Sequence, residues 1–259
     1  MTYRFFALFL LAAAGILGWS CERNVLTVPS TPTPAGARIK LVHAAPDAPG
    51  VNLFVNNQKI SAGLPTGASS TSAGTGTPTP IVFGGTFPGS TANYAVVTSG
   101  QVSVSLTAPA TTTATSATTV YVQSLTLDDQ KFYSLLLSGT GPQPEVQLLN
   151  DDFSTATDPN KYYVRFINLI PGATAYDLLL SDGTKLVTNV GYKTVSPFIG
   201  VDIKNNASFL FRVAGTTTNV TTANTFTGST SGRVLTIVAQ GVVGKTGTLA
   251  PKLSLYVNR

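Results

Sequence analysis

The chain is poor in the residues that disulfides, zinc sites and most hydrolytic sites require. Its 259 residues include one cysteine, Cys21, and one histidine, His43. A single cysteine cannot form an internal disulfide, so packing and hydrogen bonds must hold the fold together. A zinc site needs three or four histidine, cysteine or carboxylate ligands, which this chain does not offer in a recognisable pattern. We therefore expect no metal site and no cofactor.

Tryptophan and charge are also scarce. The only tryptophan, Trp19, lies near the N-terminus, so the rest of the chain lacks the large flat ring that sugar-binding platforms favour. Charged residues make up 10% of the chain, against about 25% in an average soluble protein. Thr, Ser, Gly and Pro replace them, β-branched and aromatic residues are plentiful, and no run is typical of a helix. This composition indicates an exported all-β protein. Because the chain also lacks any recognition motif, we expect no nucleic-acid partner.

The charge is unevenly distributed along the chain. Residues 37–150 carry four basic and four acidic residues, whereas residues 161–259 carry ten basic and three acidic residues. One interpretation is a basic face for an anionic partner such as lipopolysaccharide or an acidic glycan. The other is a set of solvated strand edges, where Lys and Arg hinder association between sheets. The basic residues are scattered along the sequence, which favours the second interpretation.

The first twenty residues have the features of a lipoprotein signal peptide. Arg4 precedes an apolar run of 13 residues that ends at Leu17, too short for a membrane span of roughly 20 residues. Ser20 is the small residue that processing requires directly before the lipidated Cys21. Trp19 is bulkier than the usual pattern at such sites.

We expect residues 1–20 to be removed and Cys21 to receive lipid, which would tether the chain to a membrane. Residues 21–36, rich in Pro and Thr, then form a disordered stalk. The alternative is an ordinary signal peptide followed by a chance cysteine. The expected location is the cell envelope, as an outer-membrane lipoprotein, with either surface or periplasmic orientation.

Two copies of one pattern occur 125 residues apart. IKLVHAAPDAPGVNLFV at 39–55 aligns with VRFINLIPGATAYDLLL at 164–180. In this alignment Lys40 matches Arg165. Each copy consists of an alternating strand, a turn that contains proline and a second alternating strand.

The repeat predicts two tandem β domains. We expect the first domain at 37–150, a linker at 151–160 and the second domain at 161–259. Short strands with turn signals about every eight to twelve residues predict antiparallel β-sandwiches. The predicted fold class is therefore all-β.

Three segments rich in Gly, Ser and Thr do not fit the strand pattern. They cover residues 61–80, 107–119 and 216–232. The simplest interpretation is a tolerated surface loop at each place. The functional alternative is a binding loop, because loops on rigid sandwiches often carry recognition.

The motif LVHAAPDAPGVNLFVNN at 41–57 resembles the opening motif of a bacterial family, domain of unknown function 4397. The second copy, RFINLIPGATAYDLLL, resembles a degenerate form of the same motif, and VGYKTVSPFIGV at 190–201 is similar to a later family segment. The resemblance implies a pair of immunoglobulin-like β-sandwiches on an exported, lipid-anchored protein of the Bacteroidetes type. The family has no established catalytic residues to transfer to this chain.

Neither His43 nor the acidic residues point to catalysis. A Ser-His-Asp triad would have to use His43, with Asp47 nearby, but no Gly-x-Ser-x-Gly motif supplies an exposed serine. The repeat places Asn168 at the position of His43, which predicts a shared structural hydrogen bond at the end of a strand. The pairs Asp128-Asp129 and Asp151-Asp152 fit turn residues better than calcium ligands.

The candidate binding residues are three tyrosines, Tyr162, Tyr163 and Tyr192, whose rings could replace tryptophan against a sugar. The predicted function is a non-enzymatic, lipid-anchored envelope protein that serves as a display, binding or adhesion module. Its expected partners are the membrane, through the lipid, and a glycan or another envelope protein. The alternative is an accessory glycan-binding subunit of an envelope polysaccharide-uptake or secretion system.

Overall fold

The computed structural model describes residues 34–61, 79–91, 94–172, 174–203, 205, 207–226 and 232–259. Cys21, the expected signal peptide and nearly all of the expected stalk lie outside these residues. The described residues contain 17 β-strands and one three-residue 3₁₀ helix, Gly247–Leu249. The fold is therefore all-β, as the composition predicts. No helical segment of the described residues has the length and hydrophobicity needed to cross a membrane.

The N-terminal sandwich consists of two sheets. One has the order β4-β1-β8-β9, with β5 also paired to β1; its strands are β1 (Ala37–His43), β4 (Thr86–Phe87), β5 (Ala95–Val97), β8 (Phe132–Ser138) and β9 (Glu145–Asn150). The other has the order β3-β2-β6-β7; its strands are β2 (Asn52–Val55), β3 (Gln58–Lys59), β6 (Gly100–Ala108) and β7 (Thr118–Leu127). Asn56 and Asn57 both have positive φ and form the two-residue turn between β2 and β3.

The C-terminal sandwich repeats this arrangement. One sheet has the order β13-β10-β16-β17; its strands are β10 (Lys161–Asn168), β13 (Ile199–Asp202), β16 (Val234–Gln240) and β17 (Lys252–Val257). The other has the order β12-β11-β14-β15; its strands are β11 (Tyr176–Leu180), β12 (Lys185–Val190), β14 (Ser208–Val213) and β15 (Asn224–Thr225). The structure thus has two β-sandwiches, one after the other along the chain.

Corresponding strands pair in the same way in both sandwiches. β1 runs parallel to β8, with Lys40 opposite Ser134, and β10 runs parallel to β16, with Arg165 opposite Thr236. The sequence predicted antiparallel sheets, and these two parallel pairs are corrections to that prediction. The chain passes through the opposite sheet between β1 and β8, and again between β10 and β16. Neither pair is joined by a hairpin, so the two strands of each pair can run parallel.

Each sandwich encloses its own hydrophobic core. In β6 the alternation is plain, because Val102, Val104 and Leu106 are buried in the first core while Ser103 and Ser105 point away from it. Burial of each such aliphatic side chain contributes about 1.5–3 kcal/mol to stability. The period of two that identified these strands in the sequence is therefore a direct consequence of one-sided burial.

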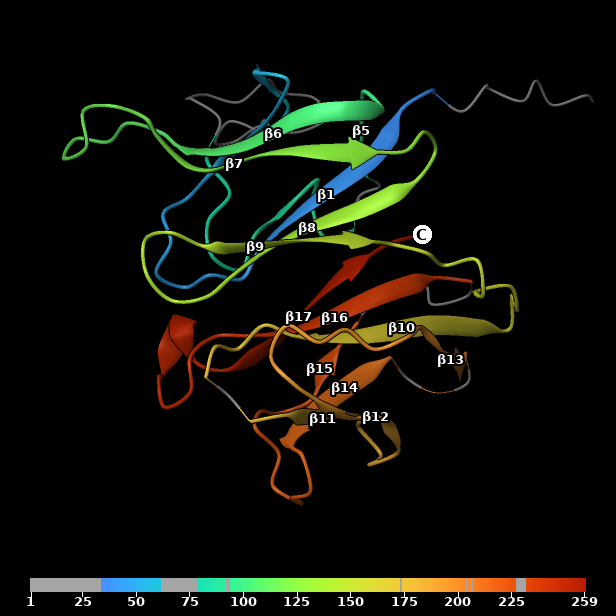
Figure 1. Ribbon diagram of the computed structural model, residues 1–259. Helices are drawn as coiled ribbons and strands as arrows, with labels where there is room; N and C mark the ends of the chain where they lie inside the picture. Colours follow the sequence, from blue (N-terminus) through green and yellow to red (C-terminus); the bar gives the residue numbers. More distant parts are fainter. Residues whose placement is uncertain are drawn as a thin grey trace, which may run out of the picture. The chain divides into compact units, whose positions relative to one another are not determined.

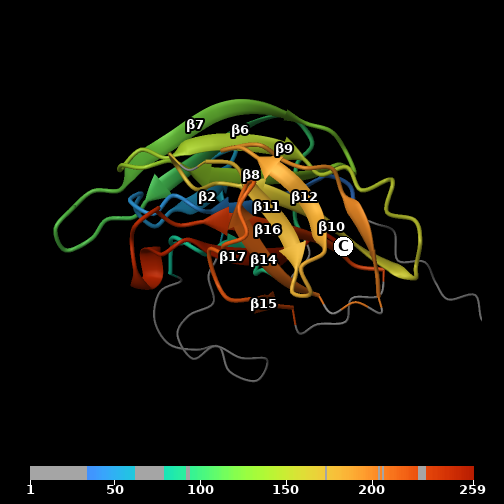
Figure 2. The ribbon, with the colours of Figure 1, turned by 90° about the horizontal axis from the view of Figure 1, so that it is seen from below.

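The sheets that contain β1 and β10 are covered on both faces. All seven residues of β1 and all seven of β16 are buried. Their inner faces pack into the two sandwich cores, and their outer faces meet in a third cluster that includes Val42, Leu136, Ile167, Val238 and Tyr256. The four sheets therefore lie as successive layers, which Figure 1 shows from the side; in Figure 2, seen from below, the strands of the two sandwiches overlap. Both sandwiches belong to one compact unit, Ala35–Arg259.

Of the three loops expected from composition, only 107–119 is described throughout. Its first residues complete β6 and its last residues begin β7, so part of the expected loop is strand. Residues 110–117 between the two strands are exposed, and Thr111 Oγ1 accepts a hydrogen bond from the amide of Ala114 at 2.9 Å. Most of 61–80 and the end of 216–232 lie outside the described residues.

Candidate functional site

Tyr162, the first of the candidate binding tyrosines, lies in the core of the second sandwich. Its side chain in β10 has no exposed surface, and its ring contacts Phe209 at 6.4 Å between centroids. Burial raises the pKa of the Tyr162 hydroxyl to about 12. As placed by the fold, this ring offers no face to a ligand, so Tyr162 does not form the sugar platform that the sequence suggested.

Tyr163 points to the opposite side of β10 and is also buried. It lies in a small cluster with Phe153, Ala156 and Val234. Its hydroxyl accepts a hydrogen bond from the amide of Asp158 at 3.0 Å. These contacts hold the segment between the two sandwiches against β10, which is a structural task.

Tyr192 lies where the second sandwich meets the first. Its hydroxyl donates to Ser138 Oγ at 3.3 Å, and the ammonium of Lys193 lies 5.6 Å from its ring centroid. Lys193 forms an ion pair with Glu145 of β9. Tyr192 is half-buried, and its partners show that it connects the sandwiches. A binding role for Tyr192 stays a prediction.

His43 and Asn168 each make a hydrogen bond to a backbone carbonyl at the ends of β1 and β10, although the acceptors lie in different segments. His43 Nε2 lies 3.0 Å from the carbonyl oxygen of Pro49, and Asn168 Nδ2 donates to the carbonyl of Val190 at 3.1 Å. Both side chains are fully buried. The predicted structural hydrogen bond at this position is therefore confirmed. Burial lowers the pKa of His43, which favours the neutral ring.

The acidic pairs divide into turn residues and one interior carboxylate. Asp152 Oδ1 accepts from the amide of Ser154 at 2.9 Å, and Asp128 accepts from the hydroxyl of Tyr133 at 3.4 Å, as expected near turns. Asp151 is different, because its side chain has no exposed surface. The prediction that Asp151 is a turn residue is wrong. It follows β9 directly and points between the two sandwiches.

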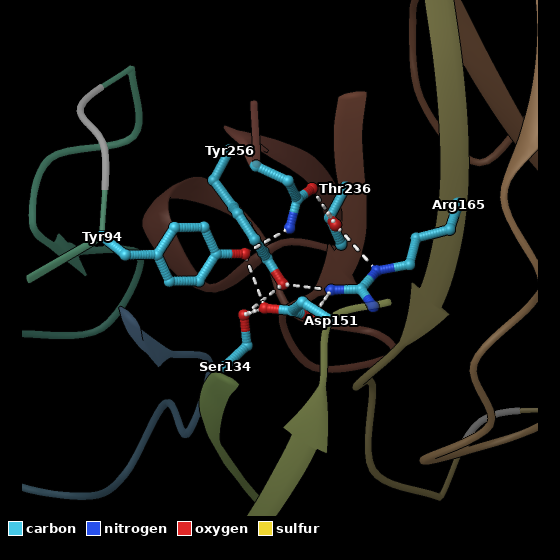
Figure 3. A network of polar contacts seen from close by, with 7 residues as sticks. Tyr94, Ser134, Asp151, Arg165, Thr236 and Tyr256 are labelled. Atoms are coloured by element: carbon cyan, nitrogen blue, oxygen red, sulfur yellow. Dashed lines mark hydrogen bonds and ion pairs between the residues drawn. The ribbon is translucent and has the colours of Figure 1, made fainter. Parts of the chain in front are cut away.

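Asp151 is the acceptor at the centre of a buried polar network. Its carboxylate accepts hydrogen bonds from the hydroxyls of Tyr94 and Ser134, both at 2.6 Å. It also pairs with the guanidinium of Arg165, which belongs to β10 of the second sandwich. Figure 3 shows these groups converging on the carboxylate. One carboxylate thus connects side chains of both sandwiches.

Arg165 distributes its remaining donors within the second sandwich. Nε donates to Thr236 Oγ1 at 2.8 Å, and a terminal nitrogen donates to the hydroxyl of Tyr256 at 3.1 Å. The guanidinium also lies over the ring of Phe198, at 4.8 Å from the centroid. Burial alone would lower the pKa of Arg165, but the nearby oxygens of Tyr256 and Asp151 raise it, so the guanidinium stays charged.

Further hydrogen bonds close the network into a ring. The hydroxyl of Tyr256 donates to Ser134 Oγ at 3.0 Å, and Thr236 Oγ1 donates to Asn258 Oδ1 at 2.7 Å. Asn258 Nδ2 then donates to the hydroxyl of Tyr94 at 2.6 Å. Each hydroxyl in the ring donates one bond and accepts another. The ring is therefore satisfied as a whole, which is the condition for a buried polar cluster to stabilise a fold.

A hollow of about 490 Å³ opens where the first sandwich lies against β17. Its lining residues are Ser90, Thr91, Asn224, Thr225, Phe226, Arg233, Leu255 and Val257. The amide of Val257 donates to the carbonyl of Ser90 at 2.7 Å, which holds the two walls together. Arg233 is the one charged residue among these lining residues.

The described residues contain no group of three or more His, Cys, Asp or Glu side chains that could hold a metal ion. The side chains that line the hollow include hydroxyls, a side-chain amide, one aromatic ring and one guanidinium. The hydroxyls, the amide and the guanidinium can donate hydrogen bonds to a polar or anionic ligand.

The family model for a domain of unknown function (DUF4397) matches residues 37–178. This match includes more than half of the 259 residues. The chain belongs to the DUF4397 family. The match begins with β1 and ends within β11, so the matched segment contains Lys40, Asp151 and Arg165 but not Thr236, Tyr256 or Asn258.

A solved structure of a "putative cell adhesion protein" from Bacteroides fragilis is similar over 86% of this chain and 98% of that chain, with 10% identity and a TM-score of 0.19. A TM-score this low supports no structural argument. A search of curated proteins finds no match.

In this DUF4397 protein, Lys40 of the first sandwich corresponds to Arg165 of the second sandwich. Lys40 is buried beside the hydrogen-bonded network around Asp151. Its ammonium lies 5.2 Å from the ring centroid of Tyr94 and 5.8 Å from that of Tyr256. Nζ also donates to the carbonyl of Gly89 at 3.4 Å. Burial lowers the pKa of Lys40 to about 8, and attraction to the Asp151 carboxylate only partly opposes the effect.

We expect the free energy of unfolding to depend on Lys40 above pH 8. Between pH about 8 and about 10 the unfolded chain keeps the lysine proton and the folded chain releases it, so stability rises with pH. Burial raises the pKa values of Tyr94 and Tyr256, so above about pH 10 the folded chain keeps tyrosine protons that the unfolded chain loses. These two tyrosines therefore lower the stability as the pH rises further. Urea unfolding from pH 7 to 10 measures how the free energy of unfolding changes with pH. Lys40→Met should remove the rise between about pH 8 and 10, and the exposed control Lys59→Met should keep it. An equal slope in all three proteins would contradict the assignment.

Proposed function

We propose that the protein is a non-enzymatic, lipid-anchored component of the cell envelope that works as a binding or adhesion module. The observation that carries this proposal is the closed ring around Asp151, which draws side chains from both sandwiches into one buried network. A network of this kind fixes the arrangement of the two sandwiches before any ligand arrives. Preorganisation of this sort reduces the entropy lost on binding.

The placement of the reactive residues supports a non-enzymatic role. His43 is fully buried and bonded to a backbone carbonyl, so it does not face solvent or a substrate. Asp151 is fully occupied by Tyr94, Ser134 and Arg165. Among the described residues, the one histidine and the most buried carboxylate thus serve the fold, which supports the proposal.

We further propose that the second sandwich is a diverged second copy of the DUF4397 domain. It has the same sheet orders and the same parallel central pair as the first. Lys40 and Arg165 also occupy equivalent positions, each under an aromatic ring from the neighbouring strand segment, Tyr94 or Phe198. The domain limits 37–150 and 161–259 follow from this interpretation.

The hollow beside β17 is the surface that best fits a ligand. Arg233 supplies a cation, Phe226 a ring, and Ser90, Thr91 and Thr225 supply hydroxyls. This combination matches an acidic glycan, whose carboxylate or sulfate would pair with Arg233. The same hollow favours the alternative role as an accessory glycan-binding subunit of a polysaccharide-uptake or secretion system.

The lipid anchor is tested by metabolic labelling with a fatty-acid analogue in a bacterial host that processes lipoproteins. We expect the protein to incorporate the label and to fractionate with membranes, because Cys21 would carry acyl chains. Cys21→Ser should lose both properties, whereas Ser20→Ala, which keeps a small residue before the cysteine, should retain them. Label that persists in Cys21→Ser would exclude lipidation at this residue.

The ligand is tested by binding of the purified protein to an array of neutral and acidic glycans. We expect acidic glycans to bind and Arg233→Ala to weaken that binding by at least about tenfold, because an anion loses its charged partner. Lys245→Ala is the matched control, since it removes one positive charge from an exposed site outside the hollow. If both variants lost glycan affinity equally, the loss would follow from net charge alone, and a binding site in the hollow would be contradicted.

A further inference from the structure

The outer strands of the four sheets differ sharply in length and charge. Four of them have four to six residues and each includes a charged residue: β9 has Glu145, β12 has Lys185, β13 has Asp202 and β17 has Lys252. The outer strands β3, β4, β5 and β15 have only two or three residues. Short length and charge are two of the ways in which a sheet edge avoids pairing with another chain, beside proline, β-bulges and covering segments.

β7 is the exception among these outer strands. It has ten residues, TTVYVQSLTL, and none of them is charged. Within the described part of the chain it pairs with β6 alone. In an antiparallel pair every second residue directs its N–H and C=O away from the partner. The outer edge of β7 therefore presents a long row of backbone donors and acceptors.

The middle of this edge also presents an apolar side chain. Val122 is 65% exposed, the highest exposure among the large hydrophobic side chains of the described residues. It lies opposite Ser105 in the register with β6. The corresponding outer strand of the second sandwich, β15, consists only of Asn224 and Thr225. The long neutral edge is thus a property of the first sandwich and not of the repeated fold.

We propose that two copies of this chain pair through β7, antiparallel and about a two-fold axis, so that two four-stranded sheets become one sheet of eight strands. Self-pairing places β7 against itself, and because the strand has no charge, no like charges oppose each other in any register. The ladder with β6 shifts register at Val120, so the continuous edge runs from Tyr121 to Leu127, and two such edges match in length. The contact is isologous, so it closes as a dimer, and the edges of the joined sheet are then the two-residue β3 strands.

Charge also favours a second copy over a foreign strand as the occupant. A partner selected by charge would find no complementary group on β7. The whole chain carries a formal net charge of +5, and pairing through an uncharged strand keeps the positive charges of two copies out of the contact. β7 and the exposed, uncharged segment before it provide such a surface.

Sedimentation of the purified full chain at concentrations up to about 1 mM tests the pairing. We expect a concentration-dependent dimer. Val122→Lys and Val122→Glu should each weaken it by about tenfold, because the two-fold brings like charges together. An equimolar mixture of the two variants should restore association, since opposite charges then face each other. Val243→Lys, at a valine 56% exposed outside β7, is the matched control and should leave the dimer intact.

Disulfide trapping locates the axis in the same dimer. In a Cys21→Ser background, single cysteines at Val122, Gln123 and Ser124 should cross-link copies most rapidly at the residue nearest the two-fold axis. A cysteine at Val243 should not cross-link. A chain that stays monomeric over the whole range would overturn the proposal, as would a dimer unaffected by Val122→Lys.

Discussion

Asp151 and Arg165 carry opposite charges in the interior, with 0% and 3% of their side chains exposed. An isolated buried charge is costly, and each of these two is tolerated only because the other is present and hydrogen bonds satisfy the remaining atoms. The two residues come from opposite sides of the contact between the sandwiches. Each sandwich therefore supplies one charge of a pair that is stable in the interior only when the two sandwiches are in contact. This constraint requires the two sandwiches to pack against each other.

The constraint explains several features that have no obvious reason within one sandwich. β1 and β16 are buried along their whole length because their outer faces meet the other sandwich. Tyr94, Ser134 and Tyr256 are needed as hydroxyl donors, so polar groups occur among apolar neighbours. The hollow with Arg233 lies at the edge of the same contact, where the loop of Ser90 rests on β17. A ligand there would touch both sandwiches in a fixed geometry.

Much of the fold could be predicted from local sequence pattern. Alternation in segments such as VSVSL identifies strands with one buried face, and the 125-residue repeat identifies corresponding strands in the two sandwiches. The interior network could not be predicted, because periodicity does not show what covers the outer face of a sheet. Asp151 looked like a turn residue beside Asp152, and Tyr162 looked like a possible platform. One signal was present: Lys40 and Arg165, a basic residue in the middle of the same apolar strand in both copies.

Calorimetric unfolding of the full chain tests most directly whether the Asp151–Arg165 pair makes the two sandwiches one unit. The account predicts a single transition whose calorimetric and van't Hoff enthalpies agree. Arg165→Met should lower the stability by about 3–5 kcal/mol and separate the transition into two, because Asp151 is left charged and unpaired. Glu145→Gln, which removes the exposed pair with Lys193, should cost less than about 1 kcal/mol and keep one transition. Two independent transitions in the unmodified chain, or no effect of Arg165→Met, would contradict the account.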